Sequence, residues 1–312
     1  MKVKIFQGHV LDALKQIESN SIDCIITSPP YWGLRDYGED ANTDWGDWHG
    51  QLGLEPTLEL YLKHMLQITK ELKRVLKPTG VMFWNHGDSY TSYYGKHGNR
   101  TTKEKWGDRG SLTDDLRPPI PKKIPYKSLC LQNYRLVLRM VDEQGWILRN
   151  IIIWHKPNHM PSSVKDRFTN AYEPIFMLVK RKRYWFDLDA VRVPHKLNFG
   201  PPSKAKSSGQ KWEGLQTIAK HSGYYGPNGE LLVNPLGKNP GDVWTIPTQP
   251  FPEAHFATFP EKLVEPMIKA GCPKEGIVLD PFMGSGTTAK VCLLYTSPSP
   301  RDLSTSRMPS SA

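Results

Sequence analysis

The stretch "IDCIITSPPYW", residues 22–32, decides the fold of this chain. Its first part, Ile22 to Thr27, is a mostly apolar run bounded by a polar turn and by proline, which is typical of a parallel strand buried on both faces. The chain then leaves this strand through Ser28-Pro29-Pro30-Tyr31, and each proline fixes its φ angle and removes a backbone donor. Such a loop predicts a rigid holder for a short polar group and a flat ring.

Strands and helices alternate along the rest of the chain. We expect further strands at residues 3–7, 81–84, 147–154, 174–179 and 276–280. Apolar residues at helical spacing indicate helices at residues 11–17, 57–76, 129–141 and 260–271. This order predicts an α/β fold with a mostly parallel twisted sheet and helices on both faces. Ligands of such sheets bind at the carboxyl ends of the strands, so the segments after Thr27 and after Asp280 are the candidate active-site loops.

The second candidate loop lies in "LDPFMGSGTTA", residues 279–289. Glycines let a backbone approach a ligand closely, and the start of the following helix offers unpaired N–H groups. A tight strand-to-helix turn and a loose dinucleotide fingerprint are both open at this point. The carboxylate of Asp280 would repel a pyrophosphate, whereas it suits a ligand that carries a cationic amine and hydroxyls, such as S-adenosylmethionine.

The Ser-Pro-Pro-Tyr loop has the groups to hold an amine. A carbonyl before or within the Pro29-Pro30 pair has no competing donor nearby, and together with the Ser28 hydroxyl it can accept both hydrogens of an amino group. Tyr31 offers a face on which a planar ring can stack. The alternative is a rigid turn that packs Tyr31 into the core.

Charge is spread unevenly over the 312 residues, which carry 41 Lys and Arg against 31 Asp and Glu, a net charge of +10. Residues 91–127 hold nine Lys and Arg against four Asp and Glu, and residues 180–220 hold ten against three. These segments also carry the aromatic residues Tyr93, Tyr94, Trp106, Tyr184, Trp185 and Trp212. Basic segments with aromatic side chains predict contact with nucleic acid, although a lysine-rich loop can also be merely solvated.

Several other classes of protein are disfavoured. There is no run of about 18 apolar residues, and the N-terminus lacks the apolar stretch of a signal peptide. The four cysteines have no CxxC spacing, which argues against a zinc site and against a disulfide framework. We therefore expect a cytoplasmic protein with no metal site and no membrane partner.

Taken together, the motifs resemble those of the DNA amino-methyltransferases. "TSPPYW" comes first, "WHKPNHMP" and "YEPIFMLVK" follow, and "HFATFP" and "LDPFMGSGTT" come last. This order is similar to that of the β group of the family, whose members methylate N4 of cytosine or N6 of adenine. The resemblance covers most of residues 1–291. It implies a Rossmann-like S-adenosylmethionine-dependent methyltransferase fold, double-stranded DNA as the substrate, and no metal.

The resemblance also implies roles for single residues. The catalytic loop that receives a flipped base would be Ser28, Pro29, Pro30 and Tyr31. The cofactor would be bound by Asp280, Phe282, Gly284, Gly286 and Thr287, with Thr258 and Pro260 lining it from the other side. His9 stands where the family often has an aspartate that reaches the cofactor's adenine. A serine before Pro-Pro favours N4 of cytosine in this family, and N6 of adenine is the alternative.

The resemblance divides the chain into parts. The catalytic core would comprise residues 1–180 and 241–291, with an irregular target recognition region at residues 181–240. Residues 292–312 are rich in Ser, Pro and Arg, so we expect a disordered or non-native tail and, with it, weak cofactor binding. An inactive DNA-binding protein with a truncated cofactor fold and an oxidoreductase are the competing functions. A cognate restriction endonuclease is a candidate partner, and both monomer and dimer are open.

Overall fold

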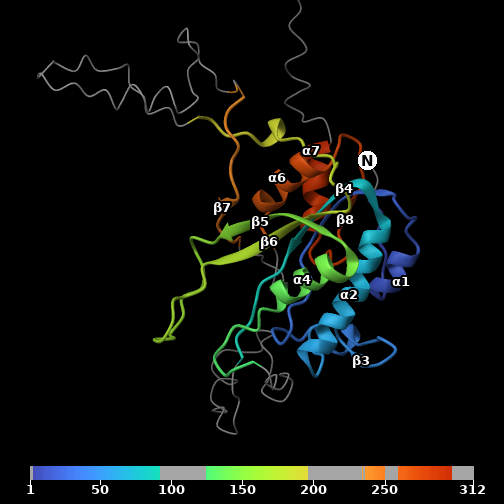
Figure 1. Cartoon of the computed structure of the whole chain (residues 1–312), viewed down its shortest axis with the longest axis vertical. Helices are drawn as coiled ribbons and strands as arrows, with labels where there is room; N and C mark the ends of the chain where they lie inside the picture. The colour runs from blue at the N-terminus through green and yellow to red at the C-terminus, as the bar shows by residue number, and fades with distance from the viewer. Residues whose placement is uncertain (1–2, 92–123, 196–233, 235, 250–258, 297–312) are drawn as a thin grey trace, which may run out of the picture. The chain divides into compact units, whose positions relative to one another are not determined.

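A six-stranded sheet forms the centre of the protein, with the strand order β7-β5-β6-β4-β1-β8 (Figure 1). The computed structural model describes residues 3–91, 124–195, 234, 236–249 and 259–296. The strands of this sheet are β1 (Ile22–Thr27), β4 (Leu76–Asn85), β5 (Ile147–His155), β6 (Tyr172–Val179), β7 (Val243–Thr245) and β8 (Val278–Leu279). A separate small sheet pairs β2 (Thr43–Asp44) with β3 (His49–Gly50) and follows the 3-10 helix η1 (Glu39–Ala41).

The central sheet is mostly parallel, as predicted. β1 runs parallel to β4 and to β8, and β5 runs parallel to β7, whereas β6 is antiparallel to both β4 and β5. Thr27 pairs with Trp84, so β1 and β4 end at the same edge of the sheet. The pairing of His155 with Tyr172 brings the end of β5 and the start of β6 to this edge as well. We call it the carboxyl edge.

Helices cover both faces of the sheet and form two hydrophobic cores. α1 (Val10–Lys15), α2 (Leu58–Val75) and α4 (Gln132–Gln144) pack on one face, and α6 (Glu261–Gly271) and α7 (Thr287–Thr296) pack on the other (Figure 1). In β1, Ile25 belongs to the first core, while Cys24 and Ile26 belong to the second. Both faces of β1 are therefore buried, which explains its mostly apolar sequence.

The longest helix, α2, follows its sequence pattern closely. The Thr57 hydroxyl caps it by accepting a hydrogen bond of 3.2 Å from a backbone N–H in the first turn. Its buried face repeats at helical spacing through Tyr61, Met65, Ile68 and Leu72, which are all fully buried. The helix predicted for this stretch is confirmed.

The strand predicted at residues 3–7 is not formed. Val3 and Ile5 are 48% and 68% exposed, and residues 3–7 pair with no described strand. β1 already has β4 on one side and β8 on the other, and β8 is only two residues long. The sheet thus offers little edge on which a further strand could pair.

The last described helix runs further than expected. α7 continues to Thr296, beyond the boundary predicted after Val291, and Val291 and Cys292 are buried in the same core as α6. Cys292 enters this core, whereas Leu293 and Leu294 of the same helix are 41% and 56% exposed. Residues 297–312 of the predicted tail lie outside the described residues.

The chain divides into two compact units, residues 1–186 with 242–312, and residues 187–241. In the second unit the structure describes the 3-10 helix η2 (Asp189–Val191) and a bridge between Val193 and Lys238. Most of the predicted recognition region and much of both basic segments lie outside the described residues. None of the helices in the described part is long and apolar enough to cross a membrane.

Candidate active site

The two predicted loops meet at the carboxyl edge through one carboxylate. Asp280, which follows β8, accepts a hydrogen bond of 2.7 Å from the Thr27 hydroxyl at the end of β1. Its second oxygen accepts from the Thr288 hydroxyl in α7 at 2.7 Å, and the N–H of Phe282 donates to the first oxygen at 3.1 Å. Burial raises the pKa of Asp280, and these hydrogen bonds oppose the rise. Asp280 therefore ties the glycine loop to the strand that leads into Ser28–Tyr31.

A chain of buried hydrogen bonds holds the second proline of the catalytic loop. Burial lowers the pKa of His86 to about 3, so its imidazole is neutral. An indole N–H can only donate, so Trp84 donates to Nδ1 of His86 at 3.3 Å and the ring proton lies on Nε2. Nε2 donates to the Tyr61 hydroxyl at 3.1 Å, and this hydroxyl donates to the Pro30 carbonyl at 2.9 Å. The Pro30 end of the loop is thus held by Tyr61 of α2 and, through it, by the end of β4.

The Tyr31 hydroxyl lies among three polar groups. It is 3.2 Å from the Ser28 hydroxyl, 3.2 Å from a carboxylate oxygen of Glu173 and 3.4 Å from the Asn85 side-chain oxygen. Burial and the charge of Glu173 raise the pKa of Tyr31 well above its usual value, so the phenol keeps its proton and donates it. The ring lies beside His86, with the ring centroids 5.1 Å apart. Ser28 and Tyr31 are therefore brought together, and Tyr31 is held at both its ring and its hydroxyl.

Glu173 and Lys156 are site residues that the sequence did not reveal. Glu173 is near the start of β6, and its other carboxylate oxygen forms an ion pair with Lys156, just after β5. The ammonium group of Lys156 also lies 4.1 Å from the ring centroid of Trp154. The motifs "WHKPNHMP" and "YEPIFMLVK" contain these residues, but only the pairing of β5 with β6 and of β6 with β4 brings them to Tyr31.

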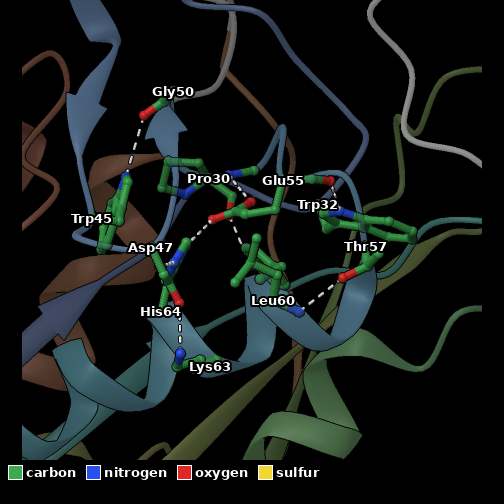
Figure 2. Close-up of polar contacts among 12 residues, drawn as sticks. Pro30, Trp32, Trp45, Asp47, Gly50, Glu55, Thr57, Leu60, Lys63 and His64 are labelled. Atoms are coloured by element: carbon green, nitrogen blue, oxygen red, sulfur yellow. Dashed lines mark hydrogen bonds and ion pairs between the residues drawn. The ribbon is translucent and has the colours of Figure 1, made fainter.

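Trp32 anchors the far end of the catalytic loop. Its indole N–H donates to the Glu55 carbonyl at 2.9 Å (Figure 2). Its backbone N–H donates to the Gln132 side chain at 2.7 Å. The Glu55 carboxylate meets Nδ1 of His64 at 3.0 Å, while Nε2 of His64 meets Asp47 at 2.9 Å. Burial lowers the pKa of His64, but these two hydrogen bonds outweigh it and raise the pKa above its usual value. The segment between the catalytic loop and α2 is thus tied to α2.

The glycine loop leaves room for a ligand. Gly284 and Gly286 have φ angles of +52° and +81°, a conformation that favours glycine. A Cβ atom built at Gly286 would meet no atom of the described residues within 4 Å. α7 begins at Thr287, so the N–H groups of its first turn have no partner within the helix. Phe282 packs against the first core and holds the start of the loop.

The remaining predicted cofactor residues are less closely connected to this loop. Pro260 is the N-cap residue of α6, and Thr258 lies outside the described residues. His9 precedes α1, and its ring centroid lies 4.5 Å from that of Trp45. Burial lowers the pKa of His9, and its Nε2 atom is buried without a hydrogen-bond partner among the described residues. Such an atom is uncommon in a folded protein and marks a place for a further polar group.

The fold and the two joined loops define a Rossmann-like methyltransferase. The fold is similar to that of the solved PvuII DNA methyltransferase (cytosine-N4-specific), with a TM-score of 0.55 and 20% sequence identity over 91% of this chain and 76% of that chain. A family model described as DNA methylase matches residues 22–296, and the chain belongs to this family of N6 and N4 methyltransferases.

Two relatives are similar over most of their length. The Type II methyltransferase M.Cfr9I of Citrobacter freundii is 38% identical over 92% of this chain and 79% of its own length. The Type II methyltransferase M.SmaI of Serratia marcescens is 36% identical over 93% of this chain and 82% of its own length. The family predicted from the motifs is confirmed.

Proposed function

We propose that the chain transfers the methyl group of S-adenosylmethionine to the exocyclic amine of a flipped base in double-stranded DNA, with N4 of cytosine as the acceptor. The hydrogen bond of 2.7 Å between Thr27 and Asp280 supports this proposal most directly. It joins a loop suited to an amine with a loop suited to the cofactor, and both lie at one edge of the sheet.

The cofactor would be held by the glycine loop. The space beside Gly286, which no described residue fills, and the N–H groups of the first turn of α7, which have no partner within the helix, suit a ligand with several polar groups. Asp280 already accepts three hydrogen bonds from the protein, so its main part is to set the shape of the loop. When bound, S-adenosylmethionine supplies an electrophilic methyl group. Further contacts would come from Phe282, Gly284, Thr287, Thr258, Pro260 and His9.

The catalytic loop would hold the amine. The Ser28 hydroxyl and the Pro29 carbonyl are acceptors for its two hydrogens, and no described residue donates to the Pro29 carbonyl. An amine held in this way directs its lone pair at the methyl group, and the attack needs no covalent enzyme intermediate. Hydrogen bonds from the amine strengthen as it becomes positively charged, which favours the transition state. Tyr31 would contact the plane of the base.

The proton released by the methylated amine has a path to a carboxylate. The Ser28 hydroxyl is 3.2 Å from the Tyr31 hydroxyl, which is 3.2 Å from Glu173. A carboxylate is a much stronger base than a neutral serine or tyrosine hydroxyl, and it can accept the proton before passing it to solvent. We therefore assign Glu173 as the final proton acceptor, reached through the two hydroxyls.

The choice of cytosine rests on Ser28, because a serine before Pro-Pro favours N4 of cytosine over N6 of adenine in this family. The basic region at residues 181–240 would read the recognition sequence from the major groove. Since relatives of the chain are Type II methyltransferases, we expect a cognate restriction endonuclease as its partner in the cytoplasm.

A methyl-transfer assay with labelled cofactor on mixed-sequence duplex DNA, followed by nucleoside analysis, tests the proposal. We expect N4-methylcytosine as the labelled product. Labelled N6-methyladenine would show that adenine and not cytosine is the acceptor. The absence of any labelled base would favour an inactive DNA-binding protein. Ser28→Ala should nearly abolish transfer while calorimetry shows unchanged cofactor binding. The exposed Ser19→Ala is the matched control, and full activity of Ser28→Ala would refute the role of Ser28.

A further inference from the structure

An exposed hairpin connection lies at the carboxyl edge beside the candidate site. It joins β5 to β6 over residues 156–171 and projects from the ends of these strands (Figure 1). Glu173, at the base of the hairpin, is 3.2 Å from the Tyr31 hydroxyl. Met160 and Phe168 in this connection are 85% and 96% exposed. Side chains this exposed add almost nothing to the core, so packing does not account for them.

The backbone around Phe168 is braced, although its ring is not. The guanidinium of Arg167 lies 4.0 Å from the ring centroid of Tyr90 and donates to the Phe168 carbonyl at 3.2 Å. The Tyr90 hydroxyl donates to the Asn170 side chain at 3.2 Å. Residues on both sides of Phe168 are therefore held to the same tyrosine. This arrangement presents the ring to solvent from a restrained backbone, which lowers the entropy cost of using it in binding.

The hairpin is also cationic. Between residues 156 and 171 it carries Lys156, Lys165 and Arg167 against the single carboxylate of Asp166. That carboxylate is itself paired with Lys127 at 2.5 Å. Cations beside an exposed apolar ring complement a duplex, because phosphates flank every base step and an apolar side chain can enter between bases.

We propose that Phe168 enters the base stack of duplex DNA and fills the gap left by the flipped base, with Lys165 against the neighbouring phosphate. The inference rests on the proposed function, since that function requires a flipped base. Extruding a base breaks its stacking and its pairing, and an aromatic ring in the gap restores part of the stacking. Glu173, at the base of the hairpin, contacts Tyr31, so the hairpin rises from the same edge of the sheet as the loop that would receive the base.

A rescue experiment tests the role of Phe168. The substrate is a duplex that carries the methylated sequence found by nucleoside analysis and sequencing. Phe168→Ala should lower kcat/KM on this duplex by about 10- to 100-fold, and Phe168→Trp should keep most of the activity. With an abasic site opposite the target base, flipping is already easy, so the loss in Phe168→Ala should largely disappear. Leu138→Ala is the matched control, since Leu138 is 62% exposed on α4.

Two outcomes of this assay would overturn the inference. Phe168→Ala could methylate the intact duplex as fast as the wild type does. Alternatively, it could lose the same factor on both duplexes, which would mean that the ring has no part in opening the base pair.

Binding separates a failure of this inference from a failure of the proposed function. The probe is a short duplex with one central abasic site, compared with the intact duplex by fluorescence anisotropy. No base has to be flipped in this binding experiment, which measures only how well the ring stacks in a ready-made gap, so wild type should prefer the abasic duplex by about 10-fold more than Phe168→Ala does, even if no DNA receives a methyl group. Equal preference in the two proteins would overturn the inference. So would a fall in molar mass of Phe168→Ala in sedimentation, because the ring would then bind a second copy of the chain.

Discussion

Replacing Tyr61 with phenylalanine should remove the hydrogen bond that holds the catalytic loop at Pro30 and should lower the stability of the protein. The Tyr61 hydroxyl accepts from Nε2 of the fully buried His86 at 3.1 Å and donates to the Pro30 carbonyl at 2.9 Å. Tyr61→Phe removes the Tyr61 hydrogen bond from both groups, and a buried polar group that loses its partner costs about 1–3 kcal/mol. Pro30 is partly exposed, so water compensates it in part. We expect the free energy of unfolding to fall by about 2–4 kcal/mol.

Urea denaturation followed by tryptophan fluorescence measures this loss. Tyr134→Phe is the matched control, because the Tyr134 ring packs 5.5 Å from that of Phe176 and no described residue bonds to its hydroxyl. The control should change stability by less than about 0.5 kcal/mol. The methyl-transfer rate of Tyr61→Phe should fall while cofactor binding is kept. If the two variants unfold at the same urea concentration, the hydrogen-bond chain has no energetic importance and the reasoning is wrong.

Three further predictions concern groups around the same loop. Thr27→Val should cost about 1.5–3 kcal/mol of unfolding free energy, because the hydroxyl bonded to the Asp280 carboxylate is lost. Thr27→Ser keeps the hydroxyl and serves as the control. Equal losses of stability in both variants would contradict this reason. Glu173→Gln should lower kcat about 100-fold at neutral pH, since the proton must then pass directly to solvent, and kcat of this variant should recover as pH rises. A loss of kcat that is constant across the pH profile would leave Glu173 only a positioning role. Between pH 7 and pH 5, stability should fall by about 2 kcal/mol, because His86 takes up a proton in the unfolded chain (usual pKa 6.5) but stays neutral in the folded protein, where its pKa is about 3. This stability is present above pH 6.5 and is lost as pH falls towards 3. Urea titrations of His86→Gln should show a flatter dependence of the unfolding free energy on pH. If this pH dependence is unchanged in His86→Gln, the low pKa assigned to His86 is wrong.

Much of the fold could be predicted because its signals are local. The apolar run of β1 and the helical spacing in α2 repeat within a few residues, and both elements formed where expected. The strand predicted at residues 3–7 was wrong for the opposite reason. Its alternating residues suit a strand, but a strand also needs a free sheet edge, and β1 is already paired on both sides.

The partners within the candidate site could not be predicted in this way. Thr27 and Asp280 are 253 positions apart, and Tyr31 and Glu173 are 142 positions apart. Each pair forms only because the strand order brings the ends of β1, β6 and β8 to one edge. The role of Tyr61 was hidden as well, since its spacing marks it as a core residue of α2 and its hydroxyl is not visible in that pattern.

The sequence by itself determined the α/β class, the family and the two loops, because proline, glycine and apolar spacing restrict the backbone over a few residues at a time. Only the tertiary structure decided which groups hold those loops. Strand register and helix packing set Asp280 against Thr27, His86 against Tyr61, and Glu173 against Tyr31. A hydrogen bond depends on two side chains meeting within about 3 Å, and no local pattern specifies the second partner.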